Sequence, residues 1–333
     1  MPTPTVYPTS KQFLGWAKET TQGTAVAPTS YMPFDSFQPA DKPTWLDDKA
    51  RRAAMAATYG RVQGPIHTEF QGSGPAFMDQ IPALLYNILG DLVSAGTTPK
   101  THTLGLLNSG TGQPPSLTLA HWQGTPATNQ VRLYAGACLS ELTLSGNADS
   151  SLITVEFKGT GYPSAISGSP VTPTFSAVLP QASWRYQIGL GGTVAGAPNK
   201  KIRDWTFTFA RELRVENTSQ NSQSPFIIQR GQLEVTGSAT VTVPNDETEF
   251  LYLINNTQPQ LQVKGDNGGA GATLFGLQLD AQLCAMDTDE IKLDEEAIGY
   301  NLTWLAIANA TNVGASGGLG PATVVVTNQT ASY

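Results

Sequence analysis

The chain has 333 residues, of which 14% are charged and 40% hydrophobic, and it carries a formal net charge of -7 with a pI of about 5.0. This length accommodates two domains of ordinary size or one large β domain, with enough apolar side chains to form a core without disulfides or metal. The acidic balance disfavours a nucleic-acid-binding protein, because contacts to phosphates need clustered Lys and Arg. The low charge suits a protein whose surface becomes interface, because charged residues are depleted at interface cores.

Cysteine usage and hydropathy indicate the compartment. Cys138 and Cys284 lie far apart in apolar, strand-like runs without a CxxC pattern, so we expect buried thiols in a reducing environment. The first residues lack a basic region followed by an apolar stretch, so we expect no signal peptide. No run reaches the roughly 18 apolar residues of a membrane span. We therefore expect synthesis in the cytoplasm and no membrane partner.

The first 30 residues are rich in Pro and Thr and contain one short apolar run, so we expect an arm that docks on another surface. From residue 31 onward, apolar and polar residues alternate, which is typical of antiparallel strands with one buried face. For example, Trp205, Phe207 and Phe209 alternate with Thr206 and Thr208. The half-buried β-strand is therefore the dominant element that we expect.

Two segments have helical spacing instead. Segment 75–89 repeats apolar residues at helical intervals, and Pro82 is expected to kink or interrupt the helix. Segment 247–255 follows Asn245 or Asp246 as a candidate N-cap and has acids in its first turn. The sequence therefore predicts one helix in each half of the chain.

The two halves share an order of elements: a strand, a long loop, a second strand, a helix and three further strands. The expected segments are 31–38, 41–59 (loop), 61–72, 75–89 (helix), 117–122, 137–146 and 150–161, and then 202–213, 214–229 (loop), 230–243, 247–255 (helix), 260–264, 273–287 and 296–308. The strand before each helix carries a similar phrase, GPIHTEFQG at 64–72 and GQLEVTGSA at 231–239. We interpret this order as a tandem duplication, the alternative being a chance similarity of two β-rich stretches.

This interpretation divides the chain into an arm at 1–30, a first unit at 31–162, a linker at 163–200 and a second unit at 201–333. The Pro, Gly and Ser content of the linker distinguishes it from the strands on either side. The expected fold class is mainly β, with two tandem β-sandwich units that form a barrel on assembly and are each flanked by one α-helix.

No motif indicates catalysis or ligand binding. Residues 314–318 formally match a nucleophile elbow, but His67, His102 and His121 all precede the Ser and the surroundings are a Gly/Ala/Ser loop. The acidic stretch 287–296 lacks the spacing and the Gly of a calcium loop. The histidines do not have the HxxxH or HExxH spacing of a zinc site, and the chain has no Walker A sequence and no G-x-G-x-x-G at an expected strand–helix junction. The sequence therefore predicts no catalytic, cofactor or metal site.

The N-terminal segment carries the residues that place this sequence in a family. In FLGWAKETTQGTAVAPTSYMPF at 13–34 the motif residues are Gly15, Lys18, Glu19, Gly23, Thr24, Ala25 and Pro28, and QGSGPAFMDQIPALLYNILGD follows at 71–91. Together with the order of elements, these segments resemble phage tail tube proteins over nearly the whole chain. A single-domain subunit of that family would lack the second unit found here.

The resemblance implies a structural, non-enzymatic protein without cofactors. In this family each tube domain is a β-sandwich with one helix, six domains form a ring, and their inner sheets close into a barrel around a channel that passes DNA during ejection. Rings stack through N-terminal arms and a long loop. The implied location is the virion tail of a long-tailed siphophage.

The duplication predicts a ring of three chains with pseudo-sixfold symmetry, the alternative being a true hexamer. The implied partners are further copies of the chain, stacked rings, and tail terminator, tape measure and baseplate proteins. The resemblance also implies that DNA passes transiently, without specific binding. Other classes that the sequence leaves open are a carbohydrate-binding or adhesin-like β module and, less in keeping with its Ser and His order, a β-rich hydrolase.

Two sets of residues are predicted to serve assembly. The polar parity of the strands predicts that acidic residues line the channel and repel DNA from its wall; these are Glu69, Glu141, Glu156, Glu234 and Asp280. The arm and the loops are predicted to contact neighbouring rings; these residues are Phe13, Trp16, Trp45, Asp47, Lys49, Arg51, Arg52 and Arg214.

Overall fold

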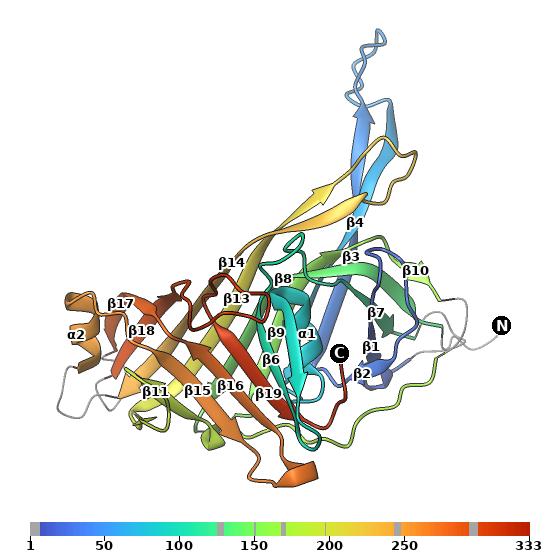
Figure 1. The fold of residues 1–333 in the computed structure, drawn as a ribbon. Coiled ribbons are helices and arrows are strands. Elements are labelled where there is room, and N and C mark those ends of the chain that lie inside the picture. Colours follow the sequence, from blue (N-terminus) through green and yellow to red (C-terminus); the bar gives the residue numbers. More distant parts are fainter. Residues whose placement is uncertain are drawn as a thin grey trace.

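The computed structural model describes residues 7–124, 130–149, 151–167, 171–196, 198–242, 248–292 and 299–333. This part of the chain is mainly β, in two antiparallel sheets with two α-helices (Figure 1). The expected fold class is confirmed in this respect. The alternation of apolar and polar residues explains the outcome, because each strand buries one face against a second layer.

The longer sheet contains a path of eight antiparallel strands. Its order is β3 (Ser36–Asp48), β4 (Gly60–Pro75), β9 (Thr154–Gly161), β8 (Arg132–Asn147), β13 (Ile202–Glu216), β14 (Ile227–Thr242), β18 (Gly299–Ala306) and β17 (Cys284–Lys292). Within the described residues, β3 and β17 are the two ends of this path and each pairs on one side only. Both therefore carry unpaired backbone groups.

The first four strands of this path and the last four follow the same order. In β3-β4-β9-β8 and in β13-β14-β18-β17, a hairpin is followed by a second antiparallel pair, whose later strand comes before its earlier strand in the sheet. The β3–β4 hairpin has one register shift, between Pro43 and Trp45, and the β13–β14 hairpin has two. The shift between Arg211 and Leu213 lies at the corresponding place, and the other, between Ile202 and Asp204, lies before the counterpart of β3. When the two corresponding bulges are matched, Gly64 corresponds to Gly231. The similar phrases in the sequence align the two hairpins in the same way. The two hairpins therefore correspond residue by residue.

The second layer consists of two sheet regions. One is built on the first half of β8 from β7 (Leu117–Trp122), β1 (Phe13–Lys18), β2 (Ser30–Met32) and β10 (Ala165–Ile166). The other is the seven-stranded sheet of β12 (Pro198–Asn199), β11 (Gln187–Leu190), β15 (Leu261–Asp266), β16 (Gly276–Ala281), β19 (Thr323–Asn328), β6 (Lys100–Leu106) and β5 (Gly90–Ala95). The hairpin β5–β6 thus joins the early part of the chain to β19 near its end.

The core between the layers shows one exchange of large and small residues at corresponding positions. Phe70 on β4 lies opposite Gly159 on β9, whereas Gly237 on β14 lies opposite Trp304 on β18. A Cβ at Gly159 would lie 2.5 Å from the Phe70 ring, and one at Gly237 would lie 2.2 Å from Trp304. In each case one ring fills the space that two side chains could not share.

Helix α1 (Ile81–Leu89) is almost completely buried and packs against β8, β6, β5 and β13. It begins after the position expected from the sequence, because β4 continues to Pro75, and Pro82 lies in the first turn without breaking the helix. Helix α2 (Thr248–Ile254) packs against β17. Its expected N-cap residues, 245 and 246, lie outside the described residues.

Three sequence expectations are corrected by the strand pairing. Segment 41–59 is not all loop, because β3 runs to Asp48 and β4 begins at Gly60. Segment 163–200 is more than a linker, because it contains β10, β11, β12 and a short 3-10 helix at Ser183–Arg185. Segment 1–30 contains β1, which pairs with β7 and β2. The strands β10, β11 and β12 are too short to show an alternation, and Pro39 and Pro43 interrupt the alternation of β3, so neither case is recognised from the sequence without the partner strand.

Candidate assembly surfaces

One face of the long sheet carries mostly polar side chains in rows that cross from strand to strand. One row consists of Gln38, Gln71, Lys158, Glu141, Ala210 and Glu234, and the next of Ser36, Ser73, Glu156, Thr143, Thr208 and Thr236. Neighbouring side chains hydrogen-bond along the rows: the hydroxyls of Thr143 and Thr208 lie 2.9 Å apart, and Gln71 donates to Gln38 at 2.9 Å. We call this surface the polar face.

Four of the five acids predicted to line a channel lie together on the polar face. Glu69 is 3.4 Å from Lys42, and Glu141 is 2.7 Å from Lys158, so each of these two carboxylates is balanced by a cation. Glu156 and Glu234 are exposed and form no ion pair within the described residues. The four acids and the two cations leave an excess of negative charge on this surface.

Asp280 lies apart from these four acids. It is on β16 in the seven-stranded sheet, where its carboxylate accepts hydrogen bonds from the amides of Gln260 at 2.9 Å and Gln262 at 3.0 Å. The alternation of polar and apolar residues correctly placed Asp280 on the polar side of its strand, but this alternation cannot show to which sheet a strand belongs. The structure therefore does not bring Asp280 together with the others.

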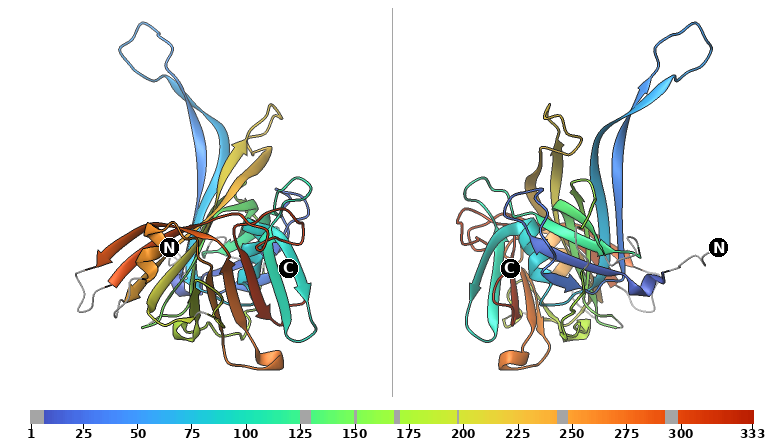
Figure 2. Two further views of the ribbon diagram at one scale, coloured as in Figure 1. Left: turned by 60° about the vertical axis from the view of Figure 1, so that its left-hand side comes forward. Right: turned by 90° about the vertical axis from the view of Figure 1, so that its right-hand side faces the viewer.

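The hairpin β3–β4 projects far from the body of the protein and ends in the loop 49–59 (Figures 1 and 2). Its outer part carries Trp45, which is 51% exposed, with the Arg61 guanidinium 5.6 Å from the ring. Asp47 accepts a hydrogen bond from Arg61 at 2.7 Å, which holds the pKa of the Asp47 carboxyl below its usual range. Exposed Trp and Arg side chains such as Trp45 and Arg61 are of the types that are enriched at protein interfaces.

The remaining loop residues that we predicted for ring contacts also lie on projecting hairpins. Arg52 pairs with Asp48 and lies over the Tyr59 ring at 4.8 Å. Lys49 and Arg51 are exposed beside it in the same loop. Arg214 is on the hairpin β13–β14, which projects in the same direction as β3–β4, and it pairs with Glu216 (Figure 1). The structure thus places these cations at two tips on one end of the molecule.

Phe13 and Trp16 lie elsewhere, and their predicted role is corrected. Both are 6% exposed on β1; the Phe13 ring stacks on Trp122, and the Trp16 indole donates to Gln80 at 2.9 Å. The run of apolar residues in the N-terminal segment thus packs against the chain's own β7 and is not available to another ring.

Glu19 is a buried residue of the N-terminal motif, and the sequence analysis predicted no role for it. Its two carboxylate oxygens accept hydrogen bonds from Ser116 Oγ at 2.6 Å, Thr118 Oγ1 at 2.7 Å, Gly136 N at 2.8 Å and Gly23 N at 3.0 Å. Because its donors come from three separate segments, this carboxylate fixes the N-terminal turn to β7 and β8. An acid followed by Gly at i+4 was the only local signal for this contact.

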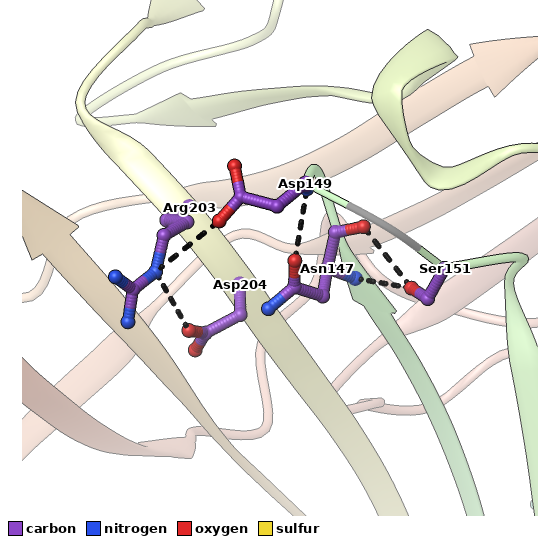
Figure 3. Close-up of polar contacts among 5 residues, drawn as sticks. All are labelled: Asn147, Asp149, Ser151, Arg203 and Asp204. Carbon is purple, nitrogen blue, oxygen red and sulfur yellow. Dashed lines mark hydrogen bonds and ion pairs between the residues drawn. The ribbon is translucent and has the colours of Figure 1, made fainter.

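The junction between β8 and β13 joins the two halves of the long sheet. It runs in register from Asp204 opposite Asn147 to Ala210 opposite Glu141. At one end, the Arg203 Nε lies 3.7 Å from a carboxylate oxygen of Asp204 and 3.9 Å from one of Asp149, beside the turn that Asn147 organises (Figure 3). Backbone pairing and a charge cluster therefore hold the halves together.

The sequence was also compared with known protein families. A family described as "Phage tail tube protein" matches residues 9–329. The chain belongs to the phage tail tube protein family. It is therefore a structural component of a phage tail, as the resemblance in its N-terminal segment predicted. A search of curated protein sequences found no match.

The described ranges also bear on metal binding, membrane insertion and the state of the cysteines. No group of three or more His, Cys, Asp or Glu residues there could hold a metal ion. None of the helices in that part of the chain is long and apolar enough to cross a membrane. Both cysteines are free and buried, as the sequence predicted.

Proposed function

We propose that three copies of this tail tube protein close into a ring, and that stacked rings form the tube through which the DNA of a long-tailed phage passes. The observation that carries the proposal is the repeated strand order in the long sheet, with one open edge at each end. If each half is one tube unit, three chains supply six units. Pairing the open edges then closes the sheet without unsatisfied backbone groups.

In this ring the polar face lines the channel. Three chains of eight strands give a barrel about 45–50 Å across between backbones, from the strand spacing and the usual tilt, which is wide enough for a DNA duplex. Glu69, Glu141, Glu156 and Glu234 repeat around the wall with few cations. Because DNA carries dense negative charge, the wall repels it and leaves it free to slide.

The projecting hairpins are proposed to hold one ring to the next. Trp45, Asp47, Lys49, Arg51 and Arg52 lie on the tip that extends furthest, and Arg214 lies on the second hairpin beside it. Tail terminator, tape measure and baseplate proteins are the proposed partners at the ends and in the interior of the tube.

Electron microscopy of the purified protein tests this proposal. We expect tubes whose reconstruction shows three chains per ring and the four acids of the polar face directed into the channel. Replacing loop 49–59 by a short turn should leave folded protein and rings but no long tubes. Particles that remain single at all concentrations would exclude the proposal, and six chains per ring would exclude the two-unit arrangement.

A further inference from the structure

The two helices occupy corresponding places in the chain. Each follows the second strand of a projecting hairpin, and each packs against a strand at the same position in the repeated order, α1 against β8 and α2 against β17. Each is followed by a residue in the left-handed region, Gly90 with φ of 89° and Asn256 with φ of 49°. These end residues give a common reference for comparing the two helices.

The helices differ sharply in burial. Counted back from their ends, Leu85 corresponds to Leu251, and Ile88 corresponds to Ile254. Leu85 and Ile88 are both 0% exposed, whereas Leu251 is 48% and Ile254 is 62% exposed. Part of the cover over α1 comes from β13, the first strand of the other half of the chain. In the single chain, no corresponding strand follows β17 within the described residues.

The strand that corresponds to β13 is β3, which is the other open edge of the sheet. We infer that a second copy of this chain binds at the edge formed by β17 and α2, where its β3 pairs antiparallel with β17 and its body covers Leu251 and Ile254. This inference rests on the proposed ring and assigns the surface at which the ring closes. The β8–β13 junction is then the internal copy of the contact between chains.

The internal junction also gives the register of that contact. β8 has an irregularity between Leu139 and Glu141, and β17 has one between Met286 and Thr288. Matching these two irregularities makes position 290 the counterpart of Thr143. With this alignment, β17 is assigned the same pairing register toward the next chain that β8 has toward β13.

On the other strand, the matched bulges of the two hairpins make Ala40 the counterpart of Thr208. Thr143 and Thr208 lie directly opposite each other at the internal junction, with their hydroxyl oxygens 2.9 Å apart. Position 290 of one chain is therefore placed opposite position 40 of the next.

Charges on the exposed face of α2 test the inference. The double variant Leu251→Glu with Ile254→Glu should stay folded, because both side chains are exposed in the single chain. It should need about a hundredfold higher protein concentration to form rings, because the contact would bury two charged carboxylates in place of two apolar side chains. Sedimentation velocity measures ring formation, and circular dichroism with denaturant titration checks the fold.

The matched control is Leu251→Met with Ile254→Met, which keeps the face apolar and should form rings as the natural sequence does. If the glutamate variant also forms rings normally while remaining folded, the inference is wrong and the proposed function stands. If the natural sequence forms neither rings nor tubes, both the inference and the proposed function fail.

Disulfide cross-linking tests the register independently. Ala40→Cys with Glu290→Cys should give covalent dimers and trimers on oxidation of assembled rings. Ala40→Cys with Ile291→Cys is the control, because neighbouring positions of a strand point to opposite faces. Equal cross-linking of the two pairs would overturn the register. A ladder that continues to six chains would support the edge contact and exclude the ring of three.

Discussion

Glu19 is predicted to be a main stabilising contact of the N-terminal segment. Glu19→Gln replaces one carboxylate oxygen by an amide nitrogen, in a site where all four partners donate to the carboxylate. The hydroxyls of Ser116 and Thr118 can rotate, but the backbone N–H groups of Gly23 and Gly136 cannot accept. Whichever way the amide is oriented, one of these N–H groups faces another donor.

The magnitude follows from that lost bond. A hydrogen bond to a charged group contributes about 1.5–3 kcal/mol, and a buried donor left without a partner costs about 1–3 kcal/mol. We therefore expect Glu19→Gln to lower the free energy of unfolding by about 2–4 kcal/mol. For a chain of this length, about 3 kcal/mol corresponds to a decrease in Tm of about 4 °C.

Denaturant titration of the unassembled protein measures this difference. Glu156→Gln is the matched control, because Glu156 is exposed on the polar face and has no ion pair within the described residues; its effect should stay within about 0.5 kcal/mol. If Glu19→Gln is as stable as this control, the Glu19 carboxylate does not make the contribution to the free energy of unfolding that we describe.

Three further predictions concern local packing and ionisation. Gly23→Ala should destabilise the fold by at least about 1–3 kcal/mol in thermal unfolding, because Gly23 has φ of 82° and a Cβ there would lie 2.1 Å from the Tyr162 ring. Gly110→Ala is the control and should cost clearly less, because the space around Gly110 is open. Equal losses of stability in the two variants would contradict this account. Burial lowers the pKa of His121 to about 4, whereas the unfolded imidazole keeps its ordinary pKa of about 6.5. The free energy of unfolding should therefore be highest above about pH 6.5 and should fall as the pH drops toward 4, because the unfolded state binds the proton first. His121→Phe should reduce this dependence on pH. Both cysteine thiols should resist a thiol reagent in the folded protein and react only after unfolding, because they are 0% exposed and burial raises the pKa of each; reaction of either in native protein would refute this.

Local periodicity was sufficient for much of the long sheet. The alternation around Phe207 and Phe209 predicted β13, and the same parity correctly grouped Glu69, Glu141, Glu156 and Glu234 on polar sides of their strands. The similar phrases before the helices matched the correspondence later given by the bulges. These features depend on residues close together in the chain, and a strand displays its buried face every second residue wherever its partner lies.

The pairing of distant segments was decided only by the tertiary structure. Nothing local indicates that β8 joins β13, that the hairpin β5–β6 extends the sheet at β19, or that Asp280 belongs to a different sheet from the other acids. The burial of Trp16 and the exposure of Ile254 likewise depend on neighbours far away in the sequence. An apolar residue has the same pattern whether its cover comes from its own chain or from another, so the sequence specified the faces of these elements, and the tertiary structure determined which of them remain open.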